Sequence, residues 1–144
     1  MTEERSNAEK LEALWDAFDQ EGAAGAGRML DQIYDEGVEF NPIATAGVGG
    51  TTYRGLDGVL AFFGELDATI ESLQYEVPQF HAAGENLVVV LTRIAGIVRE
   101  TGRPLRQDLS LVYEFGPDGL AHRVTGYETP AEALEAAQRG HADA

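Results

Sequence analysis

The last quarter of the sequence constrains the fold most, because it combines a β-hairpin with a capped helix. Residues 109–115 are rich in β-formers, residues 116–119 (Gly-Pro-Asp-Gly) are a strong turn signal, and residues 120–127 have the pattern of a returning strand. Residues 129–132 (Thr-Pro-Ala-Glu) then supply an N-cap, a proline at the first helical position and a glutamate three residues after the cap. The segment predicts two antiparallel strands followed by a short C-terminal helix.

The beginning of the chain has the apolar spacing of amphipathic helices. Ser6 and Glu9 form a capping-box pattern. Apolar side chains then recur every three or four residues: Leu11, Leu14, Trp15 and Phe18. A shorter helix is expected next, with its buried side between residues 29 and 34 and Gly37 as its C-terminal stop. A short strand is expected at residues 38–41, before Pro42.

The middle of the chain predicts one more helix and then a run of strands. Asp57 is the expected cap of that helix. Its expected apolar stripe consists of Val59, Leu60, Phe63, Leu66 and Ile70. The spacing of the apolar residues then shortens to every second residue, which predicts a strand near Leu73 and Tyr75 and long strands at residues 87–99 and 105–115. Pro78 predicts an edge strand or a bulge. Gly96 is a candidate bulge or kink.

Helices that precede strands favour an α+β fold with an antiparallel sheet. A long curved sheet wrapped around the N-terminal helices makes a cone, whose inside is a natural small-molecule pocket. The length of 144 residues suits one domain, 1–144, with an ordered core at about 7–138. The glycine-rich loop at residues 44–52 matches no phosphate-binding pattern and is interpreted as a flap or rim loop.

Composition narrows the function. The net charge of −15 disfavours binding to nucleic acids and to anionic membranes. The absence of cysteine excludes disulfides and thiolate chemistry, and three dispersed histidines give no metal-binding spacing, so we expect neither a metal nor another cofactor. The polar N-terminus shows no signal peptide, and no apolar run is long enough to span a membrane, which predicts a cytoplasmic protein.

Three segments resemble the SnoaL-like group of the NTF2-like superfamily. Residues 53–59 (YRGLDGV) resemble the entry to its third helix, residues 115–120 (FGPDGL) its hairpin, and residues 123–134 (RVTGYETPAEAL) its closing segment. The resemblance covers about residues 7–138. It implies a cone-shaped α+β fold, a homodimer, and membership of a group that includes ketosteroid isomerases, polyketide cyclases, epoxide hydrolases, dehydratases and non-catalytic binding domains.

The resemblance also allows the enzyme branches to be tested residue by residue. The isomerase branch has a catalytic aspartate before a proline after the first strand, where this chain has Asn41. An amide cannot act as a general base at neutral pH. The epoxide hydrolase branch needs an Arg-x-Asp motif and a second aspartate. Here the motif reads Arg93-Ile94-Ala95, and Gly126 stands at the second position. Neither pattern is complete.

Three charged residues on the predicted strands are candidates for chemistry. Asp108 shares a strand face with Arg106 and Ser110. That face is either solvated and paired with arginines, or it lines the cone, where burial would make the carboxyl group useful in proton transfer. His122 suits proton transfer or is an exposed rim histidine. Arg93, in an apolar strand, either forms an ion pair or dimer contact or anchors an anionic ligand group.

Aromatic residues are the candidates for binding. Tyr53 borders the glycine-rich loop and could donate to a ligand carbonyl, as could Tyr127, although core packing is the commoner role of tyrosine. Trp15 is interpreted as core or pocket wall.

Two functions remain open. One is an enzyme that uses Asp108 and His122 for isomerisation, cyclisation or hydration of a small apolar carbonyl compound. The other is a non-catalytic domain that binds a metabolite.

Overall fold

The computed structural model of the chain describes residues 6–76, 78–83 and 86–143. Helices and strands follow one another as α1 (Asn7–Gly27), α2 (Leu30–Ile33), β1 (Tyr34–Asn41), β2 (Tyr53–Arg54), α3 (Gly55–Thr69), β3 (Ile70–Tyr75), β4 (Gln79–Ala82), β5 (Leu87–Val98), β6 (Pro104–Phe115), β7 (Ala121–Tyr127) and α4 (Pro130–Asp143). The α+β class is confirmed. No helix of the described residues is both long and apolar enough to cross a bilayer.

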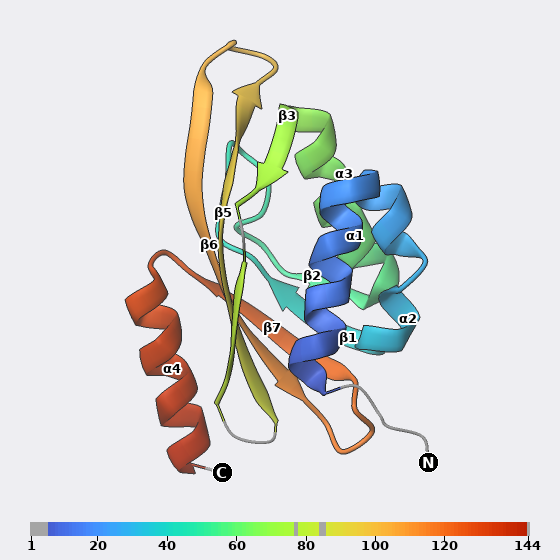
Figure 1. Cartoon of the computed structure of the whole chain (residues 1–144), viewed down its shortest axis with the longest axis vertical. Helices are drawn as coiled ribbons and strands as arrows, with labels where there is room; N and C mark the ends of the chain where they lie inside the picture. The colour runs from blue at the N-terminus through green and yellow to red at the C-terminus, as the bar shows by residue number, and fades with distance from the viewer. Residues whose placement is uncertain (1–5, 77, 84–85, 144) are drawn as a thin grey trace.

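One strongly curved sheet holds all the strands (Figure 1). Its order is β2-β1-β7-β6-β5-β3, and β4 pairs with β5 beyond the end of β3. Neighbours are antiparallel except β1 and β7, which run parallel. The predicted curved antiparallel sheet is confirmed, and its parallel pair joins two segments that lie far apart in the sequence. β3 ends at Tyr75 and β4 begins at Gln79, so the strand is interrupted near Pro78, as expected for a residue that cannot donate a hydrogen bond to the sheet.

Helices cover both faces of the sheet. α1, α2 and α3 lie on its concave side, and α4 lies on the opposite side, against β5, β6 and β7 (Figure 1). β6 alternates between the two layers: Leu109, Leu111 and Tyr113 belong to the large core under α1–α3, and Val112 packs with Val89 and Ala133 under α4. Both faces of this strand are therefore buried along its second half.

Aromatic side chains fill the inside of the curve. Trp15 is 1% exposed and contacts four rings edge-on, with centroid distances of 6.0 to 6.5 Å: Phe18, Phe63, Phe80 and Tyr113. The hydroxyl groups of Tyr34 and Tyr113 share a buried hydrogen bond of 2.6 Å. Burial raises the pKa of both tyrosines, so both remain neutral at physiological pH.

The local signals at the helix ends are confirmed in part. Glu9 N donates to Ser6 Oγ at 3.1 Å and Ser6 N donates to Glu9 Oε1 at 3.3 Å, so this capping box forms. Thr129 caps α4, because its Oγ1 accepts from Glu132 N at 3.2 Å and donates to Glu132 Oε1 at 3.1 Å. Asp57 is not a cap, because α3 begins at Gly55 and Arg54 is the cap residue.

Two other expectations for the first half of the chain are wrong. Gly37 stops no helix. α2 is a single turn, and Tyr34 already starts β1 because its ring is buried against the sheet. The buried stripe of α3 contains Phe62 in place of Leu60, which is 40% exposed.

Gly96 is not a bulge; it lies where the backbone of β5 comes very close to β3. It pairs in register with Leu105, and a Cβ atom there would collide with Ile70 Cγ2. The irregular register lies in the partner strand β3, between Glu71 and Gln74, where Ser72 has a positive φ of 56°.

Candidate functional site

A cleft opens where α1 crosses the edge of the sheet formed by β3 and β4. Its volume is about 640 Å³. Residues of α1, β3, β4 and the junction between the two strands line it: Glu9, Glu12, Ala13, Trp15, Asp16, Asp19, Tyr75, Pro78 and Phe80. The size is that of a small-molecule site, which typically measures roughly 300–1,000 Å³.

Helix periodicity explains which side chains of α1 reach the cleft. Glu9, Glu12, Asp16 and Asp19 follow one another at spacings of three, four and three residues, which places them in one stripe along the helix. All four are exposed. The neighbouring stripe is the apolar one that packs into the core. The cleft therefore has an acidic wall directly beside an aromatic interior.

Trp15 connects the cleft to the core. It is one of the residues that line the cleft, and its ring meets the ring of Phe80 at an interplanar angle of 74°. Its Nε1 atom is buried and has no hydrogen-bond partner among the described residues. Tyr75 completes the aromatic wall. Burial raises the pKa of its phenol, and the negative charges of Asp67 and Asp19 raise it further. Of the predicted site residues, only Trp15 lines this cleft.

Asp108 and Arg93 are paired with each other. They stand opposite in the β5–β6 register, and Arg93 Nε donates to Asp108 Oδ1 at 3.0 Å. Their side chains are 32% and 43% exposed. Neighbouring inward positions on β6 are held by Leu109 and by Gln107, which donates to the loop at Thr45 Oγ1. Asp108 thus lies on the outer face of the sheet in an ion pair with an arginine, which matches the interpretation that its strand face is solvated and paired with arginines.

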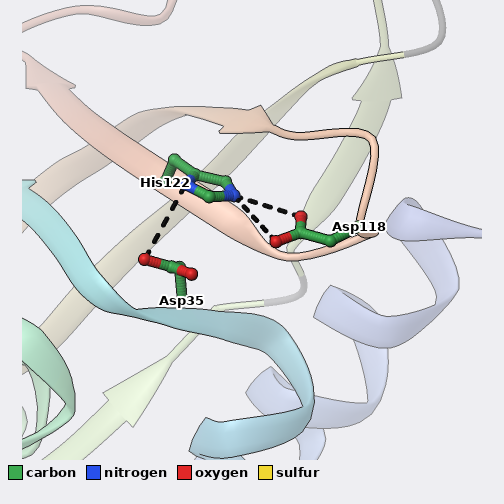
Figure 2. A group of neighbouring side chains, drawn as sticks. All are labelled: Asp35, Asp118 and His122. Atoms are coloured by element: carbon green, nitrogen blue, oxygen red, sulfur yellow. Dashed lines mark hydrogen bonds and ion pairs between the residues drawn. The ribbon is translucent and has the colours of Figure 1, made fainter.

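His122 lies between two carboxylates (Figure 2). Its Nε2 is 3.1 Å from both carboxylate oxygens of Asp118, and its Nδ1 is 3.8 Å from Asp35 Oδ2. The pKa of Asp118 is lowered, first by the Leu120 N–H that donates to it and then by His122. The ligand atoms of the three residues lie within 4.8 Å of one another. Both ring nitrogens already face a carboxylate, so a metal ion would have to displace one contact.

The structure does not bring the two predicted catalytic residues together. His122 follows Ala121, which pairs with Phe115. Asp108 lies seven positions earlier on β6, and a strand rises about 3.3 Å per residue, so roughly 20 Å separates the two side chains. Each has its own partners, and neither lines the cleft.

The two remaining predicted binding residues also lie outside the cleft. Tyr53 fastens the glycine-rich loop: its hydroxyl accepts from Gly49 N and donates to Glu65 Oε1, both at 3.3 Å. Burial and the Glu65 charge raise the pKa of this phenol. Tyr127 packs beneath α4, against the small cluster that contains Val89 and Val112.

Two of the positions at which this chain departs from the enzyme branches, Asn41 and Gly126, have structural roles here. Asn41 donates to Val124 O at 3.4 Å and accepts from Thr52 Oγ1 at 2.6 Å, so its amide ties β1 to β7 and to the loop. A Cβ atom on Gly126 would approach Ile43 N to 2.9 Å and Pro42 Cα to 3.2 Å. The backbone therefore leaves no space for an aspartate at residue 126.

The acidic stripe is the feature that sequence reasoning missed. Its spacing was visible in the sequence, because residues 9, 12, 16 and 19 repeat with the period of a helix. That Tyr75 and Phe80 face this stripe follows only from the pairing of β3 and β4 with the same strand.

Solved structures with the same architecture confirm the fold. An NTF2-like protein from Burkholderia thailandensis is 18% identical, with 91% of this chain and 98% of that chain covered and a TM-score of 0.72. A Mycobacterium tuberculosis protein in complex with estradiol-17β-hemisuccinate is 16% identical, with coverages of 87% and 95% and a TM-score of 0.65. A hypothetical protein from Catenulispora acidiphila with a ketosteroid isomerase-like fold, in complex with trimethylamine, is 14% identical, with coverages of 88% and 90% and a TM-score of 0.63.

No curated protein matches the sequence. The family model of the SnoaL-like domain matches residues 11–124, from the first buried leucine of α1 to the middle of β7. This span contains the cone-forming helices, six complete strands and the first part of the seventh. The chain therefore belongs to the SnoaL-like domain family and has the NTF2-like fold.

Proposed function

We propose that this protein binds a small organic molecule in the cleft between α1 and the β3–β4 edge. The observation that carries the proposal is a cleft of about 640 Å³ with Trp15, Tyr75 and Phe80 in its wall. Aromatic and apolar walls with a few polar groups are typical of ligand sites. The complexes of two structural neighbours with trimethylamine and with a steroid hemisuccinate support small-molecule binding in general.

Binding is preferred over acid–base catalysis on geometric grounds. The proposed isomerase, cyclase or hydratase chemistry requires a proton-transfer group beside the ligand. Asp108 is held by Arg93, and His122 by Asp118 and Asp35, at places outside the cleft. The two residues predicted to transfer protons therefore cannot act on a ligand in this cleft, and we favour metabolite binding over catalysis by Asp108 and His122.

Fluorescence offers a direct test, because Trp15 is the only tryptophan in the chain. In a screen of small organic molecules, binders should change the Trp15 emission. Ala13→Phe fills the cleft from α1 and should weaken binding at least about tenfold, a loss of about 1.4 kcal/mol. Ala61→Phe, at an exposed position of α3, is the matched control and should have no effect. The proposal fails if no compound alters the emission or if Ala13→Phe binds every compound normally.

We also propose a homodimer that forms through the outer face of β5 and β6 beyond α4. Ile97 on this face is 39% exposed, and the Arg93–Asp108 pair, four residues away along β5, is half-buried. Sedimentation at micromolar concentration should give a dimer, and Ile97→Asp should give a monomer. Leu60→Asp, at an equally exposed leucine of α3, should leave the dimer intact. A monomeric wild-type protein would contradict this proposal.

A further inference from the structure

The charge of the cleft is one-sided. Of the nine described residues that line it, four are acidic and none is a lysine, arginine or histidine. The ion pairs found between described side chains include none of these four carboxylates. Their negative field is therefore directed at the cleft and the surrounding solvent.

Contacts within the helix explain only part of this stripe, since Asp16 accepts from Gln20 Nε2 one turn on, at 3.3 Å. Glu9 belongs to the capping box and lies in the first turn, where the helix dipole favours a negative charge. Asp16 and Asp19 lie beyond that turn. Like charges three and four residues apart destabilise a helix, so the sequence retains an unfavourable pattern at the wall of the cleft.

The rest of the cleft offers what an organic cation prefers. The faces of tryptophan, tyrosine and phenylalanine attract an ammonium group that lies within about 6 Å of the ring centroid. The rings of Trp15 and Phe80 meet edge to face at 74°, and together with the neutral phenol of Tyr75 they form the aromatic corner of the cleft. The N–H of Trp15, which is 1% exposed, has no described partner, and an oxygen atom of a ligand would give it one.

We infer that the ligand is a small organic cation, an amine or quaternary ammonium compound that also carries an oxygen acceptor. Its charged group lies between the acidic stripe of α1 and the aromatic corner. The inference rests on the proposed function, because it names the ligand class of the same cleft. It also excludes carboxylate-bearing ligands, which the four acidic side chains would repel.

Three probes of the same shape separate charge from size. Choline is the cation, the alcohol in which a tert-butyl group replaces the trimethylammonium group is the neutral isostere, and the corresponding tert-butyl carboxylate is the anion. We expect choline to bind at least about tenfold more tightly than the alcohol at low salt, and the anion not to bind. The preference should shrink at about 1 M salt, where the Debye length falls to about 3 Å.

Variants test each half of the site on the full chain. Glu12→Gln combined with Asp16→Asn should lower the preference for choline about fivefold or more, and Asp31→Asn combined with Glu36→Gln is the charge-matched control outside the cleft. Phe80→Leu keeps an apolar side chain but removes the aromatic face. It should weaken choline binding by about threefold or more and leave binding of the alcohol nearly unchanged. Circular dichroism verifies that each variant is folded.

The outcomes distinguish this inference from the proposed function. Equal binding of the alcohol and choline, blocked in both cases by Ala13→Phe, overturns the cation assignment and supports the cleft as a binding site. Failure of all three probes, while other compounds of the screen bind the cleft, also overturns the cation assignment alone. Failure of every compound overturns both. Selective choline binding that the control variant keeps and the Glu12/Asp16 variant loses supports the inference.

Discussion

Trp15→Ala is expected to lower the free energy of unfolding by about 3 to 5 kcal/mol. The side chain is 1% exposed and touches rings from α1, α3, β4 and β6. Its removal leaves a cavity that rigid neighbouring rings cannot fill, and most domains have only about 5–15 kcal/mol of stability in total.

Urea unfolding followed by circular dichroism measures this effect, since the variant has no tryptophan left to report by fluorescence. Leu134→Ala, at a leucine of α4 that is 37% exposed, should change the free energy of unfolding by no more than about 0.5 kcal/mol. A loss below about 1 kcal/mol for Trp15→Ala would mean that the aromatic cluster contributes little to the fold.

Alkaline pH is expected to destabilise the protein steeply. The phenols of Tyr34 and Tyr113 have raised pKa values in the folded state, whereas in the unfolded chain they titrate near 10.0. Below pH 10 both states hold the protons, so stability is unaffected. Above it the unfolded chain loses protons that the fold retains, and each phenol removes about 1.4 kcal/mol per pH unit until its folded pKa is reached. Two phenols give about 2.8 kcal/mol per pH unit.

Urea titrations between about pH 8 and pH 11 measure that slope, and the ultraviolet absorbance of tyrosinate shows when the phenols ionise. Tyr34→Phe combined with Tyr113→Phe removes both partners of one hydrogen bond and should change stability little at neutral pH. The double variant should lose the alkaline slope that these two phenols contribute. The same slope in the double variant would assign alkaline unfolding to other groups.

Local signals predicted the elements that local contacts determine. The helix caps at Ser6 and Thr129, and the turn between β6 and β7, depend on side chains and backbone within a few residues. The end of α2 does not depend on such local contacts. Residues 34–37 leave the helical pattern because Tyr34 packs against Tyr113 and pairs with Ala121, and no nearby residue announces either contact.

The candidate site shows the same limit. Alternation along β6 correctly groups Asp108 with Arg106 and Ser110 on one face. It cannot identify the face that lines the cone, since the strand is buried on both sides, by the aromatic core and by α4. The cleft depends on β3 and β4 sharing a single partner strand, a pairing that is not encoded near Tyr75 or Phe80.

The parallel pairing of β1 with β7 has a consequence for synthesis. Phe40 is matched with Val124, and the parallel ladder that places β1 against the rest of the sheet joins residues more than eighty positions apart. Among the described strands, β1 pairs with β2 and β7, so while the ribosome is still making β5 and β6 its available partner is the two-residue strand β2. The sheet can therefore cover the helices only after residue 127 has been synthesised. A chain truncated before β7 exposes the apolar side of β1 to chaperones and to aggregation.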